Sequence, residues 1–202
     1  MASAATPYGL KPVKRLDGMP YAGAITQYLI DPAGEATNIY NGSIVILGAD
    51  GYVAISTATG ADTTTNNLGG NSIGALGVFV GCSYENAFGR QFSNHYPTGQ
   101  NYNSTPIYAH VVDDPFVLFQ AQLDSTGVQT IIGTNTLLPT VQSTSTGDLT
   151  TGISNTALDA TVQTTTSCFR IVAHVSDPAD SFVDVLVVFN ALGHRYTNSV
   201  GL

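Results

Sequence analysis

The sequence predicts an all-β protein: a small β-barrel or sandwich of about eight to ten strands, with an extended N-terminal arm and long polar loops. Short runs rich in β-branched and aromatic residues alternate with turn-forming residues along the chain. Charged residues make up only 10% of the chain, and threonine, serine, asparagine and 21 glycines take their place. This composition disfavours long helices, because threonine loses rotamer freedom in a helix and glycine and asparagine interrupt it.

The best-defined strands form a hairpin. Residues 43–47 and 52–57 are both β-rich, and Gly48-Ala49-Asp50-Gly51 between them is typical of a tight connection. The glycines within the run 72–84 indicate bulges or close approaches of the backbone. Residues 182–189 are apolar almost throughout and predict a central strand that is buried on both faces. Further strand-like runs lie at 23–31, 107–123 and 168–175.

We expect two parts in the chain, an extended arm over residues 1–22 and a single β domain over residues 23–202. Three prolines disfavour helix in the arm, because each lacks an amide donor and holds the preceding residue extended. Within the domain, residues 134–166 form a Thr/Ser/Gly-rich stretch that predicts an insertion of loops, with one short helix around residues 155–160.

Charge is divided unevenly along the chain. The first 16 residues contain Lys11, Lys14 and Arg15 and no acid, whereas the rest carries fourteen acidic residues against three arginines. An acidic body repels phosphate backbones, and three cations are too few for useful affinity, so we expect no nucleic-acid partner. No apolar run is long enough to cross a bilayer, and the first residues lack the features of a secretory signal, so we expect no membrane partner.

No arrangement of side chains predicts catalysis. His110 and His174 each precede aspartates in turns, where an aspartate usually binds local amides rather than a metal. Cys82 and Cys168 lie in apolar runs and predict buried free thiols without an activating neighbour. Nucleophile-elbow and phosphate-binding glycine motifs are absent from the sequence. We therefore expect no enzyme, no cofactor and no metal site.

The N-terminal segment carries more apolar side chains than a simple linker needs. An extended segment with aromatic and aliphatic anchors and several cations suits docking on another chain. A frayed, solvated terminus is the alternative, because termini are disordered unless they are tied down.

The same segment resembles a known family. Residues 7–24, Pro-Tyr-Gly-Leu-Lys-Pro-Val-Lys-Arg-Leu-Asp-Gly-Met-Pro-Tyr-Ala-Gly-Ala, followed by Tyr28 and Ile30, are similar to the opening of capsid decoration (cement) proteins of tailed bacteriophages, especially marine and cyanobacterial ones. The hairpin at 41–54 and the run 73–79 are similar to small β-barrel decoration domains. Together these matches cover less than half of the chain.

The resemblance implies a structural protein of the virion that binds the outer surface of the capsid, commonly as a homotrimer, and stabilises the shell. Its partner would be the major capsid protein, and repeated attachment would make modest single contacts durable. We expect Tyr8, Leu10 and Leu16 to be buried anchors at the shell, with the cations pairing with acidic shell groups. The full set of expected contact residues in the arm is Tyr8, Leu10, Lys11, Val13, Lys14, Arg15 and Leu16.

Two other classes of function stay open. The chain could serve as a receptor- or glycan-binding module of a phage tail or fibre, with Tyr96, Tyr102 and Tyr108 as stacking groups. It could also be another minor capsid or connector component. A hydrolase has the least support, because the geometry of a reactive site is missing from the sequence.

Overall fold

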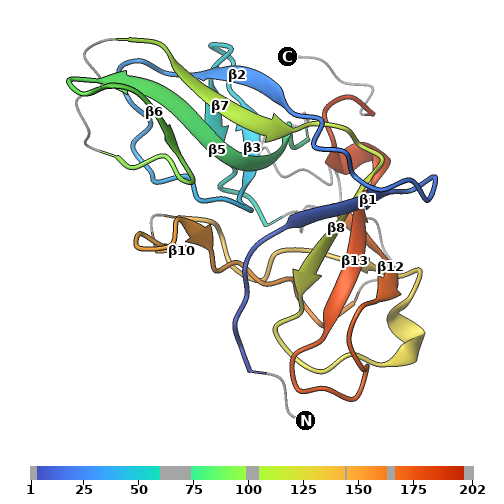
Figure 1. Ribbon diagram of the computed structural model, residues 1–202. Helices are drawn as coiled ribbons and strands as arrows, with labels where there is room; N and C mark the ends of the chain where they lie inside the picture. Colours follow the sequence, from blue (N-terminus) through green and yellow to red (C-terminus); the bar gives the residue numbers. More distant parts are fainter. Residues whose placement is uncertain (1–3, 60–73, 99–104, 144, 163–166, 198–202) are drawn as a thin grey trace.

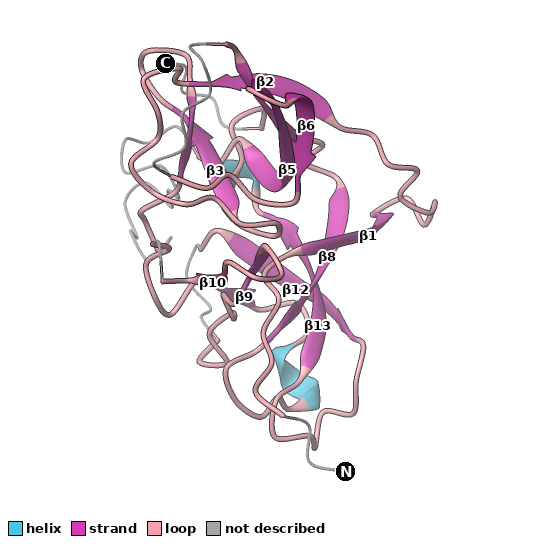
Figure 2. Ribbon diagram, turned by 60° about the vertical axis from the view of Figure 1, so that its left-hand side comes forward, coloured by secondary structure: helices cyan, strands magenta, loops and turns pink. Residues whose placement is uncertain are grey.

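The computed structural model describes residues 4–59, 74–98, 105–143, 145–162 and 167–197. Its elements form two β layers, one above the other in Figures 1 and 2. The fold is therefore all-β, as predicted, although the described residues hold thirteen strands, three of them only two residues long. The strands are β1 (Lys11–Arg15), β2 (Thr26–Ile30), β3 (Ile44–Leu47), β4 (Val53–Ile55), β5 (Gly77–Asn86), β6 (Gly89–Ser93), β7 (Ile107–Val112), β8 (Val117–Gln122), β9 (Asn135–Thr136), β10 (Gly147–Asp148), β11 (Ile153–Ser154), β12 (Phe169–His174) and β13 (Asp184–Phe189).

The upper layer is a closed barrel of five strands. Its order is β3-β4-β2-β7-β5, and β5 returns to pair with β3, which closes the ring. All of these pairings are antiparallel except that of β2 with β4. The strand β6 pairs with the second half of β5 and extends the sheet beyond the ring. The barrel interior is apolar and consists of Ile30, Ile39, Val45, Val53, Ile55, Leu76, Phe79, Cys82, Tyr96, Ile107, Ala109 and Val111.

The predicted hairpin and the predicted bulge are both confirmed in this barrel. The strands β3 and β4 pair across the connection at residues 48–51, where the Gly51 amide donates to the Gly48 carbonyl at 3.0 Å. The pairing of β5 with β7 shifts register between Phe79 and Gly81. Gly81 has a φ of +143°, and a Cβ atom there would lie 2.8 Å from the ring of Phe92. Only glycine fits this backbone without displacing that ring.

The lower layer is a five-stranded sheet in the order β1-β8-β13-β12-β9. The strand β13 lies at its centre, and its residues from Val185 to Phe189 are all buried, as predicted for a central strand. The ring of Phe189 packs against those of Phe119 and Phe169, with centroids 5.7 and 4.8 Å away. Three barrel residues join this core, one each from β3, β5 and β7: Ile44, Val78 and Val112. The two layers therefore share apolar contacts.

A buried glutamine completes the edge of the barrel strand β3. The Gln142 side chain accepts a hydrogen bond from the Ile44 amide at 2.9 Å. Its amide group donates to the carbonyls of Ile44 and Ser56 at 2.9 and 3.1 Å. Gln142 is almost fully buried, so it satisfies backbone groups that water cannot reach.

The helix expected around residues 155–160 is absent, and that prediction is wrong. In this part of the chain the backbone amides bind distant residues instead of the carbonyl four residues earlier: Asn155 donates to Thr146, and Leu158 donates to Gln122. The described residues of the 134–166 stretch form irregular chain with the short strands β9, β10 and β11. Two short 3₁₀ helices, η1 (Gln129–Ile131) and η2 (Ala191–Gly193), lie elsewhere. No helix in the described part of the chain is long and apolar enough to span a bilayer.

His194 lies where the layers meet. The residue is fully buried, its ring packs against Phe189 at a centroid distance of 5.2 Å, and it forms a parallel bridge with Ala75. Burial lowers the pKa of His194 to about 4, although the nearby charges of Asp113 and Asp114 oppose this shift. The imidazole is therefore neutral in the folded protein near neutral pH.

We expect the protein to lose stability as the pH falls from about 6.5 to about 4. In this window the unfolded chain binds a proton at His194 and the folded protein does not, which costs up to about 3 kcal/mol of unfolding free energy. Burial also lowers the pKa values of His95 and His110, so these two residues also reduce the stability of the folded protein as the pH falls. Urea unfolding of the wild type and of His194→Gln across this pH range tests the assignment. An equally steep decline in the variant would contradict it.

Candidate functional site

The N-terminal segment is fixed to its own chain instead of extending from it. The Thr6 amide donates to the Gln122 side chain at 2.9 Å, and the Leu10 amide donates to the Gly42 carbonyl at 2.9 Å. Residues Lys11–Arg15 then pair with β8 as an edge strand of the lower sheet. The segment is extended over the described residues, as expected, but it joins the lower sheet of its own chain instead of projecting from the domain, so the sheets do not divide after residue 22.

Gly9 shows why the segment follows this path. It has a φ of +71°, and a Cβ atom there would lie 2.6 Å from the Gly42 carbonyl oxygen and 2.8 Å from the Ser154 side chain. The chain therefore passes through a gap that only glycine fits, between a barrel loop and β11. The prolines predict an extended conformation, which is confirmed, but an extended segment can also pair with a sheet of its own chain.

Three of the seven expected contact residues make contacts within the chain, and one of them, Leu10, is buried. Leu10 is only 2% exposed and belongs to the lower core. Tyr8 is partly buried, and burial together with the neighbouring charge of Asp184 raises the pKa of its hydroxyl. Arg15 forms ion pairs with Asp17 and Asp114 of its own chain. Leu10 is therefore not available as an anchor at the shell, whereas contact of Tyr8 or Arg15 with a shell protein stays a prediction.

The remaining expected residues lie at the surface. Lys11, Val13 and Leu16 are exposed and Lys14 is half-buried. Contact of any of the four with a shell protein stays a prediction.

Beyond β1 the chain makes a projecting turn, visible at the right edge of Figure 1. The Arg15 amide donates to the Met19 carbonyl at 2.8 Å, and the Leu16 amide donates to the Phe116 carbonyl at 2.8 Å. These bonds bring together three large apolar side chains that face solvent. Leu16, Met19 and Phe116 are 51%, 62% and 53% exposed, and we call them the tip cluster.

Sequence reasoning missed two members of the tip cluster. Met19 and Phe116 are far apart in the sequence, and only the pairing of β1 with β8 brings their turns together. Each follows a turn residue, Gly18 or Pro115, and an apolar side chain directly after a turn was the one signal available.

A groove of about 500 Å³ lies beside the N-terminal segment. One wall consists of Tyr8, Leu10, Lys11 and Pro12, and the other residues come from β5, β11 and two loops: Val80, Ile153, Asn41 and Asn94. Most of this lining is apolar, and the exposed Lys11 adds a positive charge. We call it the interlayer groove.

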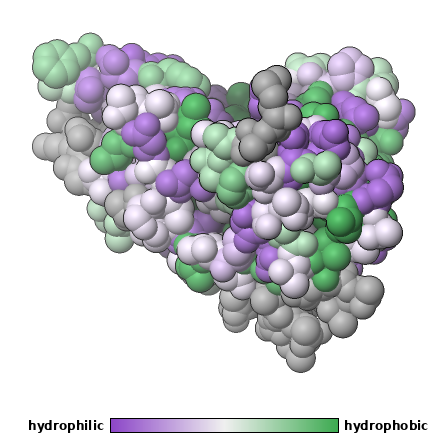
Figure 3. Space-filling model, turned by 90° about the horizontal axis from the view of Figure 1, so that it is seen from below, coloured by the Kyte–Doolittle hydropathy of each residue, from purple (hydrophilic) through white to green (hydrophobic). Residues whose placement is uncertain are grey.

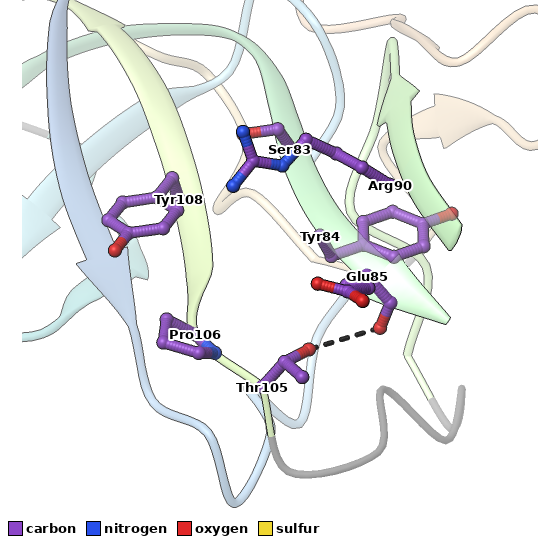
Figure 4. Close-up of a pocket in the computed structure, with 7 residues that line it drawn as sticks. All are labelled: Ser83, Tyr84, Glu85, Arg90, Thr105, Pro106 and Tyr108. Atoms are coloured by element: carbon purple, nitrogen blue, oxygen red, sulfur yellow. Dashed lines mark hydrogen bonds between the residues drawn. The ribbon is translucent and has the colours of Figure 1, made fainter. Parts of the chain in front are cut away.

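A smaller pocket of about 140 Å³ lies on the barrel wall over β5, β6 and β7 (Figure 4). Tyr108 and Arg90 flank it, and Figure 4 shows the guanidinium of Arg90 directed toward Ser83 rather than toward Glu85. Of the three tyrosines expected as stacking groups, Tyr108 is partly exposed here. Tyr96 is buried inside the barrel, so that prediction is wrong, and Tyr102 lies outside the described residues.

The histidines and aspartates of the two strand–turn patterns do not come together as reactive pairs. His110 contacts the Ser83 hydroxyl at 3.2 Å. Asp114 accepts from the Phe116 amide and Asp177 from the Ala179 amide, both at 2.9 Å, which confirms their turn role. Asp113 instead accepts from Thr26 and Tyr28. Within the described ranges, no group of three or more histidine, cysteine or acidic residues could hold a metal ion.

The two cysteines are buried free thiols, as predicted. Burial raises the pKa of both Cys82 and Cys168 to about 12, so neither is a ready nucleophile at neutral pH.

Comparison with protein-family models, with curated proteins and with solved structures finds no match for this chain. Seen from below, the molecule shows hydrophobic and hydrophilic residues interspersed rather than one continuous apolar area (Figure 3). Interspersed apolar residues are normal for a protein surface, so the projecting tip cluster is the more informative feature.

Proposed function

We propose that this protein is a capsid decoration protein, which binds the outside of an assembled shell and stabilises it. The tip cluster is the observation that carries the proposal. Leu16, Met19 and Phe116 expose large apolar surfaces at a projecting turn, where a partner can cover them. The resemblance of residues 7–24 to decoration proteins supports a major capsid protein as that partner and a homotrimer as the attached form.

The tip is held in place before any partner arrives. Arg15 pairs with Asp17 on the turn and with Asp114 beside Phe116, and β1 is held by β8. A preorganised contact loses less conformational entropy on binding than a flexible tail does. Binding of several copies to a repeating shell then raises the effective concentration of each contact.

Loss of the tip side chains is expected to weaken attachment strongly. Burial of a large apolar side chain contributes about 1.5 to 3 kcal/mol, so Leu16→Ser with Met19→Ser should cost at least about 3 kcal/mol, or about a hundredfold in affinity. Co-sedimentation with purified shells that lack this protein measures the occupancy. The matched control replaces two exposed apolar residues outside the tip cluster, Val128→Ser with Val175→Ser. Equal occupancy for the tip variant and the control would reject the proposal.

A second candidate function rests on the barrel-wall pocket. Tyr108 offers a partly exposed ring for the apolar face of a sugar, and Arg90, Glu85 and Ser83 offer donors and acceptors for its hydroxyl groups. A receptor- or glycan-binding module of a tail or fibre would use such a site. Binding on a glycan array that Tyr108→Ala removes, while shell binding is absent, would favour this function.

A third reading is another minor capsid or connector component. The number of copies per virion separates it from decoration, because a decoration protein covers the whole shell and a connector is confined to one vertex. For the decoration function, the location that we propose is the outer surface of the capsid.

A further inference from the structure

The most exposed large apolar side chain in the described residues is Phe88, at 91%. It lies at the tip of the β5–β6 hairpin, where Asn86 and Gly89 pair and leave only Ala87 and Phe88 in the turn. The Phe88 amide donates to the Asn86 side chain at 2.9 Å, which fixes the turn. An aromatic ring presented on a paired hairpin is a typical anchor for a protein contact.

The interlayer groove has the size and lining to receive such a ring. A cavity of about 150 Å³ lined by apolar side chains is enough to bind benzene. The groove has about 500 Å³, and Leu10, Pro12, Val80 and Ile153 give it apolar walls. It therefore has room for the ring of Phe88 and for part of the turn that carries it.

Phe88 cannot enter the groove of its own chain. Asn94 lines that groove and follows Phe88 by six residues, five of which form the strand β6. At about 3.3 Å per residue, about 20 Å of chain, mostly paired strand, separates the two. The ring and the groove can meet only between two molecules.

The charges beside the two surfaces are complementary. Lys11 is exposed at the groove, and Glu85 is exposed next to the hairpin turn. Neither forms an ion pair within the described chain. Figure 4 shows the Arg90 guanidinium turned toward Ser83, which leaves the Glu85 carboxylate without its cross-strand partner. When the hairpin of one copy enters the groove of another, Glu85 can approach Lys11.

We propose that the Phe88 hairpin of one copy docks in the interlayer groove of a second copy. The contact joins two different surfaces, so a pair retains the free groove of one copy and the free hairpin of the other, and repetition produces a ring or a chain. This inference goes beyond attachment to a shell and does not depend on it. The tip cluster that we assign to the shell takes no part in the contact.

Analytical ultracentrifugation of the purified chain tests the contact without any shell. We expect the wild type to self-associate as its concentration rises to about 1 mM, and Phe88→Ser and Ile153→Glu each to remain monomeric. Both side chains face solvent, so thermal unfolding of the variants should match that of the wild type. Val128→Ser is the matched control, since it removes an exposed apolar side chain outside the tip cluster, the hairpin and the groove and should leave self-association unchanged.

A mixture of the two variants gives the sharpest result. Phe88→Ser retains an intact groove and Ile153→Glu retains an intact hairpin, so the mixture should form one-to-one dimers and nothing larger. Several outcomes would overturn the proposal: a wild type that is monomeric throughout, a mixture that fails to associate, or self-association that survives Phe88→Ser. Loss of shell binding in Phe88→Ser with unchanged self-association would assign the hairpin to the shell protein instead.

Discussion

Replacement of Leu10 by alanine is expected to lower the free energy of unfolding by about 2 to 5 kcal/mol. Leu10 is 2% exposed and lies in the lower core, so its removal leaves a cavity and also loses the transfer free energy of the side chain. Equilibrium unfolding in urea measures the change. The effect is large because the N-terminal segment is a part of the fold.

Lys11→Ala is the matched control for this measurement. Lys11 is the next residue, it is exposed, and its replacement should change stability by less than about 0.5 kcal/mol. If Leu10→Ala were as mild as Lys11→Ala, the segment would have to be a free arm after all. The same packing argues against deleting residues 2–16 to test shell binding, because the deletion removes β1 and unpairs β8.

Gln142→Leu is expected to cost about 3 kcal/mol or more, although leucine is apolar and of similar size. The change removes all three hydrogen bonds of this buried side chain and takes away the partner of the Ile44 amide, whereas the Ile44 carbonyl still accepts from the Ser56 amide. Each buried group that loses its hydrogen bond costs about 1 to 3 kcal/mol. Urea unfolding gives the total, and hydrogen exchange should show the Ile44 amide losing its protection.

Gln27→Leu makes the same chemical change at an exposed position of β2 and serves as the control. We expect it to be nearly neutral. A Gln142→Leu protein as stable as this control would mean that the side chain does not complete the β3 edge.

Local patterns in the sequence predict several features of the fold correctly. The Gly48–Gly51 connection, the glycine in β5 and the apolar run of β13 each depend on neighbours within a few residues, and each prediction is confirmed. The pairing of strands that lie far apart in the sequence could not be predicted in this way. Residues 107–123 read as one interrupted block, yet β7 lies in the barrel and β8 in the lower sheet. No local pattern tells which sheet a strand will join.

The N-terminal segment shows the same limit at the site. Prolines, cations and apolar side chains describe an extended segment equally well whether it binds a neighbour or its own sheet edge. Leu10 and Leu16 look alike in the sequence, yet Leu10 packs in the lower core just before β1 and Leu16 faces solvent just after it. The helix expected at 155–160 failed for a related reason, because long-range backbone bonds replaced the local ones.

A density map of the native virus particle tests the central claim most directly. The account predicts this β body in many copies on the outer face of the capsid, with Leu16, Met19 and Phe116 covered by the shell protein. Density for the chain at the tail or at a single vertex, or on the shell with that turn facing solvent, would contradict it.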